Sequence, residues 1–182
     1  MKSKIKVNNE IMQHVEVECD PSLSSPKKEI VTKLVSKVFY KYKIETYEVS
    51  IIFAGDKLLT KLKKEFFKKN QLTDVIAFRL NNYNEPNIDG EIYISLPRAE
   101  ENSKCYKEPY SKEVLRLIIH GCLHLIGFDD NTKKHKQCKS EIIKKNINSN
   151  LWYIISILFL PGFEVAFTIR ENHRNHINYK SS

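Results

Sequence analysis

The hydrophobic and polar residues of this chain follow two different periods, which predict helices in some stretches and strands in others. Apolar residues recur at helical spacing from Ser24-Ser25-Pro26 to about Tyr42, and again over residues 58–69, where lysines occupy the opposite face. Proline is favoured at the first position of a helix and marks the start of the first one. Residues 46–53, between the two, are rich in β-branched and aromatic side chains and predict a buried strand.

The second half of the chain continues this alternation. Residues 74–80 and 91–96 have the composition of strands, and the polar loop between them is either a substrate-facing loop or a simple insertion. A short opening strand and three further helices complete the prediction: residues 4–7, 97–106, from 111 onward, and 132–145. This order predicts an α+β fold in which a small mixed β-sheet of about four strands is flanked by helices.

The chain changes character after residue 146. Residues 151–160 are almost wholly apolar and are followed by Pro161-Gly162. A bilayer span needs about twenty apolar residues, so this stretch does not predict a membrane span. It is an extra element packed on the domain, a segment that docks on a membrane or a partner, or an addition without function. We therefore divide the chain into a domain of residues 1–146 and an extension of residues 147–182 of unknown role.

The charge of the chain favours a polyanionic partner. Lysine and arginine number 30 against 22 acidic residues, which gives a net charge of +8. The excess lysines gather in residues 57–69 and 133–145. A basic surface attracts polyanions because bound counterions are released, so binding of this kind weakens as salt rises. A general enrichment of lysine on every surface is the competing explanation.

The cysteines and the first residues predict a cytoplasmic protein. The four cysteines show no C-x-x-C spacing and are expected to be reduced thiols: Cys19, Cys105, Cys122 and Cys138. Residues 1–7 alternate lysine with apolar residues and lack the apolar segment of a signal peptide.

The most informative residues are two histidines four positions apart, His120 and His124. On a helix both imidazoles lie on one face and can reach one metal ion. Gly127 is suited to ending that helix, after which the carboxylate of Asp129 or Asp130 can turn toward the same ion. Two histidines, one carboxylate and a water is a known composition for catalytic zinc. The competing explanation is a buried helix with two unrelated histidines, which the Gly-aromatic-Asp-Asp turn disfavours.

Gly121 separates this site from the zinc proteases with an HExxH motif. Those enzymes place a glutamate directly after the first histidine, where it acts as the general base. The sequence therefore disfavours peptide hydrolysis by that mechanism. What remains is a metal that makes a bound water more acidic and polarises a phosphoryl or carbonyl oxygen. Cys122 lies between the histidines but on another helix face, so it is not expected to be a ligand.

With these motifs in view, the chain resembles the YbeY family, the zinc-dependent endoribonucleases of ribosomal RNA maturation. The family motif, His-Gly-x-Leu-His-Leu-x-Gly-aromatic-Asp-His, is matched over residues 120–129. Residues 72–78 and 90–95 also resemble family motifs, which form a strand pair beside the metal cleft. The resemblance covers residues 5–146, roughly.

The resemblance implies a single-strand-specific metallo-endoribonuclease that acts in ribosomal RNA maturation, at the 3′ end of 16S RNA, and in ribosome quality control. It also implies RNA and the ribosome as partners. One zinc ion per chain is expected on the central helix and the turn after it, with His120, His124 and Asp130 as ligands. No further catalytic residue is assigned, and the oligomeric state is left open.

Two positions depart from the family pattern. Asp130 stands where the usual third ligand is histidine; zinc accepts a carboxylate oxygen, but the negative charge weakens the Lewis acid and shifts preference slightly toward manganese. Phe67 stands where many members carry an arginine that steadies the scissile phosphate, and the nearby lysines lack its bidentate fork. His135, on the next predicted helix, is a competing third ligand, although a surface position is the favoured interpretation.

Two other functions stay open at this point. One is another zinc metallohydrolase, such as a peptidase or phosphodiesterase. The other is a non-catalytic RNA- or ribosome-binding relative, in which Asp130 and the missing arginine mark lost chemistry. The sequence alone does not separate this relative from the endoribonuclease.

Overall fold

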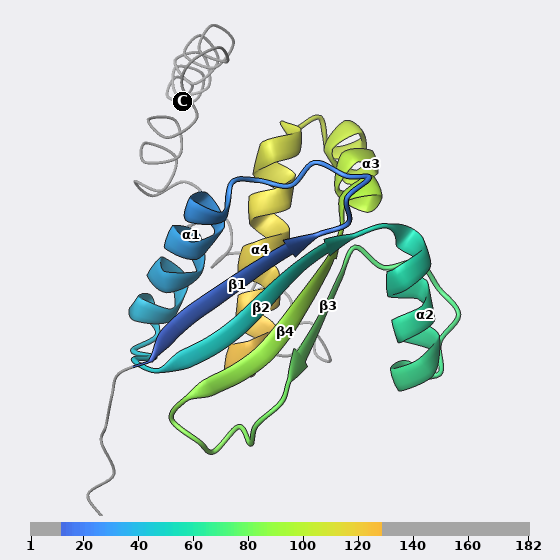
Figure 1. Cartoon of the computed structure of the whole chain (residues 1–182). Coiled ribbons are helices and arrows are strands. Elements are labelled where there is room, and N and C mark those ends of the chain that lie inside the picture. The colour runs from blue at the N-terminus through green and yellow to red at the C-terminus, as the bar shows by residue number, and fades with distance from the viewer. Residues whose placement is uncertain (1–11, 129–182) are drawn as a thin grey trace, which may run out of the picture.

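The computed structural model describes residues 12–128, which form four strands and four helices in the order β1-α1-β2-α2-β3-β4-α3-α4 (Figure 1). The strands are β1 (Gln13–Cys19), β2 (Tyr47–Ala54), β3 (Val75–Arg79) and β4 (Ile88–Ser95). The helices are α1 (Lys28–Lys41), α2 (Asp56–Phe67), α3 (Leu96–Tyr106) and α4 (Tyr110–Ile126). None of the helices between residues 12 and 128 combines the length and apolar character that a bilayer crossing requires.

The four strands form one mixed sheet in the order β1-β2-β4-β3. Strands β1, β2 and β4 are parallel, and β3 runs antiparallel to β4 at the edge of the sheet. Antiparallel pairing brings Val75 opposite Ile94 and Phe78 opposite Glu91. Because neighbouring residues of a strand point to opposite faces, β3 presents Ile76 and Phe78 to one side and Ala77 and Arg79 to the other.

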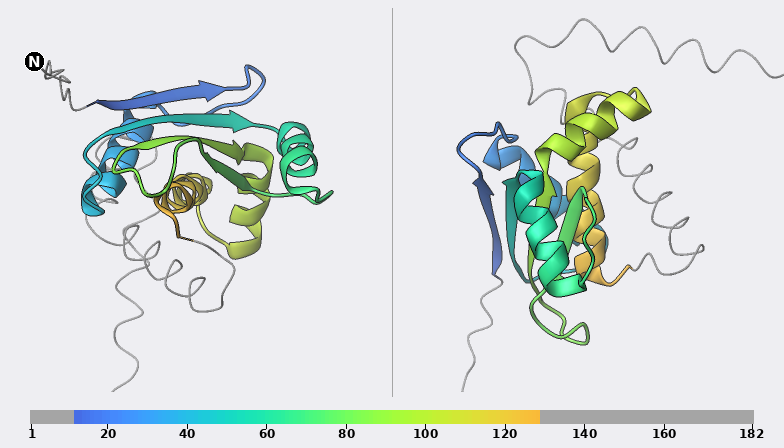
Figure 2. Two further views of the ribbon diagram at one scale, coloured as in Figure 1. Left: turned by 90° about the horizontal axis from the view of Figure 1, so that it is seen from below. Right: turned by 90° about the vertical axis from the view of Figure 1, so that its right-hand side faces the viewer.

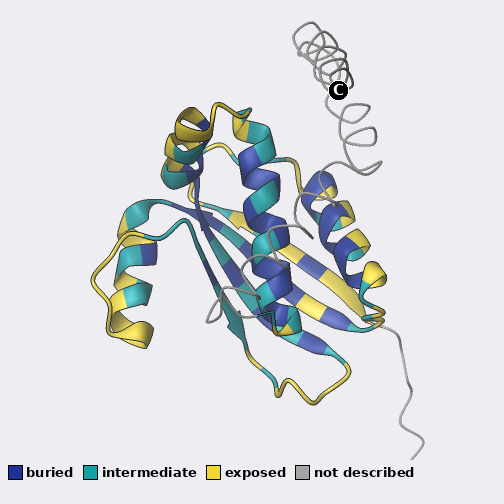
Figure 3. Cartoon of the chain, turned by 180° about the vertical axis from the view of Figure 1, so that it is seen from behind, coloured by how far each residue is buried: buried dark blue, intermediate teal, exposed yellow. Residues whose placement is uncertain are grey.

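The main hydrophobic core lies on one face of the sheet, under α1 and α4 (Figures 2 and 3). Helix α1 contributes a row of buried apolar residues at helical spacing, among them Val31, Val35 and Phe39. A second, small cluster of Ala54, Leu59 and Ile76 lies on the opposite face and attaches α2 to the end of the sheet. The edge strand β3 therefore has α4 packed on one side and α2 on the other.

The predicted α+β class and the mixed four-strand sheet are confirmed, and most element boundaries shift by one to three residues. The first helix begins at Lys28 and not at Pro26; Lys27 is its N-cap and makes no side-chain capping bond, so the helix begins near its first buried residue, Ile30. Strand β1 was not predicted. The expected strand 4–7, the helix 132–145 and the extension 147–182 lie outside the described residues.

Candidate metal centre

Helix α4 is buried on almost all sides and leaves one narrow stripe open. Between Glu113 and Leu125, all residues are buried except three, which are half-buried: Arg116, His120 and His124. Their spacing of four places them on one face, one turn apart. The apolar residues between them anchor the helix on the sheet and on α1. The burial of the rest of α4 thus fixes where both imidazoles point.

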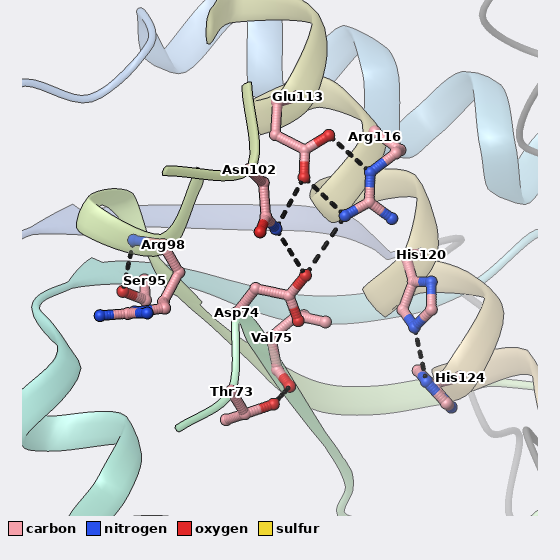
Figure 4. Close-up of polar contacts among 10 residues, drawn as sticks. All are labelled: Thr73, Asp74, Val75, Ser95, Arg98, Asn102, Glu113, Arg116, His120 and His124. Carbon is pink, nitrogen blue, oxygen red and sulfur yellow. Dashed lines mark hydrogen bonds and ion pairs between the residues drawn. The ribbon is translucent and has the colours of Figure 1, made fainter. Parts of the chain in front are cut away.

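The two imidazoles converge, as the sequence predicted. The Nε2 atoms of His120 and His124 lie 3.0 Å apart, with ring centroids at 4.8 Å (Figure 4). Two nitrogens bound to one tetrahedral zinc ion, each at about 2.0–2.1 Å, are about 3.3 Å apart. The observed separation comes within a few tenths of an ångström of that value. Two facing lone pairs at this distance repel each other unless a cation or a proton lies between them, so this donor pair fits a metal ion.

Two glycines let α4 approach the sheet closely beside this pair. A Cβ atom on Gly121 would lie 2.4 Å from Cγ2 of Ile92 on β4, and one on Gly90 would lie 2.8 Å from Cδ2 of Leu125. Such distances leave no room for a side chain at either position. Gly121, which lacks the general base of the HExxH proteases, therefore has a packing reason to be glycine.

The end of α4 is held by a set of polar contacts next to His124. Gly127 has a φ of 105°, and its N–H and that of Phe128 donate to the carbonyls of His124 and Leu123. The guanidinium of Arg79 on β3 donates to the carbonyl of Leu125 at 2.8 Å. A cation at this end also interacts favourably with the helix dipole, which is negative at the C-terminus. The same guanidinium lies over the ring of Tyr83, in the 81–87 loop, and that ring packs beside Gly127. The predicted glycine stop is confirmed, and the polar loop contributes to it.

A buried polar network lies one turn before His120 on the same stripe (Figure 4). The side chain of Glu113 is 3 % exposed and accepts from Nε and Nη2 of Arg116 at 2.7 and 2.6 Å. Nη2 of Arg116 also donates to Asp74, and Asn102 of α3 donates to both carboxylates. Burial opposes the charge on Arg116, but its hydrogen bonds and ion pairs with Glu113 and Asp74 outweigh it and raise its pKa.

This network gives Asp74 of the 72–78 motif a structural role, and its other members were not predicted from the sequence. Asp74, in the predicted 72–78 motif, ties the start of β3 to helix α4 through Arg116. Arg116, Glu113 and Asn102 were not predicted from the sequence as site residues. The signal available was the spacing: Arg116 precedes His120 by four positions and follows Glu113 by three, which predicts a shared helix face.

Cys122 takes no part in this site. It is fully buried in the main core, and that burial raises the pKa of its thiol to about 12. Its side chain is packed in the core, away from the half-buried stripe that carries the two histidines, so it is not placed to bind the same ion. Cys19 and Cys105 are free thiols as well.

The third ligand predicted from the sequence lies outside the described residues. Asp129, Asp130 and His135 all fall beyond residue 128. Within residues 12–128, no group of three histidine, cysteine, aspartate or glutamate side chains is arranged to hold a metal ion. The described part of the chain thus supplies two of the three predicted ligands and brings them together.

Comparison with known proteins decides the family. The family model described as endoribonuclease YbeY matches residues 12–150, about three quarters of the chain. The chain belongs to the endoribonuclease YbeY family. This membership makes it one of a family of hydrolases that are metalloenzymes, in agreement with the convergent histidines.

Individual relatives support the assignment. The chain is 38 % identical over 108 residues to endoribonuclease YbeY of Chloroherpeton thalassium, covering 59 % of this chain and 75 % of the relative. It is 32 % identical over 133 residues to that of Parabacteroides distasonis, covering 72 % and 89 %. A solution structure of a Thermotoga maritima protein shares the fold with a TM-score of 0.52 at 23 % identity, covering 79 % of this chain and 93 % of that one.

Proposed function

We propose that this YbeY-family protein is a zinc-dependent endoribonuclease that cleaves single-stranded RNA. His120, His124 and Asp130 would hold one zinc ion per chain, and water would complete the coordination. The observation that carries this proposal is the 3.0 Å convergence of the two Nε2 atoms on the open stripe of a helix that is otherwise buried. The names of the relatives supply the substrate class.

The residues around the proposed site determine what a bound zinc ion would do and where it would lie. A zinc ion bound there would bring the pKa of a bound water toward about 7 and polarise a phosphoryl oxygen. His120 and His124 would fix the position of that ion, because the surrounding core and the close contact at Gly121 hold their helix in place. Asp130, as a carboxylate, would complete the ligand set and lower the net charge of the centre.

Arg116 supplies a guanidinium on the same half-buried stripe of α4 as the two histidines, but the carboxylates that it binds already offset its positive charge. Its Nε and Nη2 atoms bind Glu113 and Asp74, and these three charged groups sum to −1. It therefore does not replace the family arginine, absent at Phe67, as a source of excess positive charge. The attraction for the RNA backbone would come from the lysines of α2, whose effect falls with salt.

The biological setting is proposed from the family. We expect the substrate to be ribosomal RNA, with maturation of the 3′ end of 16S RNA and ribosome quality control as the processes served. The ribosome would be a partner and the cytoplasm the location, consistent with the free thiols of Cys19, Cys105 and Cys122.

The test is cleavage of a structured RNA with single-stranded ends, with and without a metal chelator. The intact chain should cut the single-stranded parts, lose activity with chelator, and lose it by orders of magnitude in His120→Ala. His14→Ala, which removes an exposed histidine of β1, is the matched control and should cut as the parent does. RNA binding without any metal-dependent cleavage would favour the non-catalytic relative, and cleavage that persists in His120→Ala would contradict the proposal.

A further inference from the structure

Helix α2 carries an aromatic surface that the fold leaves largely exposed. Leu59 is its only buried residue, although Phe66, seven positions later, lies on the same face of the helix. Phe66 and Phe67, in its last turn, are 60 % and 44 % exposed. When exposed apolar side chains are gathered in one patch, the patch can be a site of interaction.

The two rings are held in place by a third. The ring of Phe78 on β3 lies 5.0 Å from that of Phe66 and 5.9 Å from that of Phe67, the latter stacked at 25°. The helix ends directly after them, where Lys68 adopts a left-handed conformation. We call Phe66, Phe67 and Phe78 the aromatic ledge. Because these rings are already positioned, a ligand that stacks on them pays little ordering entropy.

Lysines surround the aromatic ledge. The ammonium of Lys63 lies 5.1 Å above the centroid of Phe67. Beside the ledge, a shallow depression of α2 is lined by four charged side chains and one amide: Lys61, Lys64, Glu65, Lys68 and Asn70. Together with Lys63, the charged side chains here number five, and all except Glu65 are positive. An apolar protein partner would have to bury these ammonium groups, whereas a polyanion with flat apolar groups matches both features.

The aromatic ledge lies across the edge strand from the histidine pair. Phe78 and Arg79 are consecutive on β3 and point to opposite faces: Phe78 belongs to the aromatic ledge, and Arg79 donates to the carbonyl of Leu125 near the end of α4. The right-hand view of Figure 2 shows α2 and α4 on either side of β3. Since β3 is the edge of the sheet, an extended chain can pass around it from one helix to the other.

We propose that the aromatic ledge binds a single-stranded stretch of the RNA substrate, with bases stacked on Phe66 and Phe67 and phosphates held by the adjacent lysines. This rests on the proposed function, which supplies RNA as the substrate. A base on Phe67 would take the place of the Lys63 ammonium and leave it to bind the next phosphate. The exchange is favourable because a base–aromatic stack is stronger than an exposed cation–π contact.

The aromatic ledge also accounts for a preference for single strands. Bases in a duplex are already stacked and paired, so their faces are closed to Phe66 and Phe67. The lysines attract both forms of RNA alike through phosphate charge. Discrimination between the two forms would therefore come from the rings and not from the lysines.

The experiment measures binding of a labelled oligoadenylate by fluorescence anisotropy, using the full chain with His120→Ala so that the RNA stays intact. Adding Phe67→Ala or Phe66→Ala should weaken binding about tenfold, the loss expected for one stacked base. Phe67→Trp should restore it. Tyr40→Ala, at an 83 % exposed aromatic residue of α1, is the control and should stay within twofold of the parent. Duplex RNA of the same length should bind weakly and equally to all of them.

Lys64→Gln tests the same surface without touching a ring. It should weaken binding and lower the slope of affinity against salt by about one. Unchanged affinity in both phenylalanine variants would overturn the proposal, and so would an equal loss for duplex RNA. If chelator-sensitive cleavage is seen while the ring variants bind normally, the ledge fails and the proposed function stands. If the ring variants lose binding but no cleavage is seen, the ledge stands and the proposed function fails.

Discussion

Helices α4 and α2 pack on opposite faces of the same edge strand, and they are attached in very different ways. Between Glu113 and Leu125, α4 buries every residue except those of its open stripe, whereas α2 buries only Leu59 along its whole length. The first helix carries the convergent histidines and the second carries exposed rings and lysines. The groups proposed to hold a metal ion stand on the firmly packed helix, and the groups proposed to contact a flexible RNA strand stand on the helix with few buried residues.

The comparison predicts two classes of variant. Changes around the histidine stripe should lower the free energy of unfolding together with activity, because packing and site share one helix. Changes at the aromatic ledge should alter RNA binding with little effect on stability, because those side chains are already exposed.

The largest effect is expected for Arg116→Met. This change leaves the buried carboxylate of Glu113 without its cation, which costs about 3–5 kcal/mol of stability. Denaturant unfolding monitored by circular dichroism measures it. Lys104→Met, which breaks an exposed pair with Glu100 on α3, is the control and should cost at most about 1 kcal/mol. Similar losses in the two variants would remove the distinction between the helices.

A smaller loss is expected for Gly121→Ala. The added methyl group would meet Ile92 at 2.4 Å, and such overpacking costs about 1–3 kcal/mol. The helix must also shift, so metal affinity should fall in parallel. Gly55→Ala, where a Cβ would meet nothing within 4 Å, is the control and should leave metal binding unchanged. An unaltered melting temperature in Gly121→Ala would show that α4 is less tightly seated than the contacts indicate.

Helix α2 should respond to pH through Asp56 in its first turn. The Arg98 guanidinium donates to this carboxylate at 2.9 Å and lowers its pKa, burial works in the opposite direction, and the Ser95 hydroxyl lowers it further. A lowered pKa in the folded state means that the contribution is complete above the unfolded pKa, about 4, and is lost as pH falls through the folded value. Asp56→Asn should therefore cost about 1 kcal/mol at neutral pH.

The same difference should shrink below about pH 4. Unfolding curves of parent and variant at several pH values measure it. A difference that stayed constant between neutral and acidic pH would show that Asp56 contributes through packing and not through its charge.

The smallest effect is expected for shortening the chain to residues 1–146. The family motifs end before that point, so we propose that residues 147–182 are dispensable for the metal centre. The shortened chain should stay soluble, bind metal and cut RNA, with at most a lower melting temperature from lost apolar burial. A shortened chain that folds but cuts no RNA would show that the extension belongs to the active enzyme.

The sequence predicted what depends on local pattern. The histidine pair at i and i+4 and the glycine stop at Gly127 are both present in the structure, because helix geometry alone determines them. Strand β1 escaped prediction although Val15 and Val17 alternate with glutamates. As an edge strand it buries one face only, and its charged half weakens the pattern.

What depends on long-range contact could not be predicted. Arg116 meets Asp74 from 42 positions away, a pairing that no local period reveals. The exposure of Phe66 could not be inferred either, because it follows from where α2 meets the sheet: its contacts centre on Ala54 and Ile76 at the end of two strands. A helical period places apolar residues on one face, but only the fold decides how much of that face is covered.

The most direct test of the central claim is the metal content of the intact chain, purified without chelator and measured by elemental analysis. About one zinc ion per chain is predicted, with loss of the ion in His124→Ala and full retention in His14→Ala, at an exposed histidine of β1. If Asp130→Ala kept the ion while His135→Ala lost it, the third ligand would have to be reassigned. A chain that holds no transition metal and takes up none when zinc is added, or a His124→Ala chain that keeps full occupancy, would contradict the account.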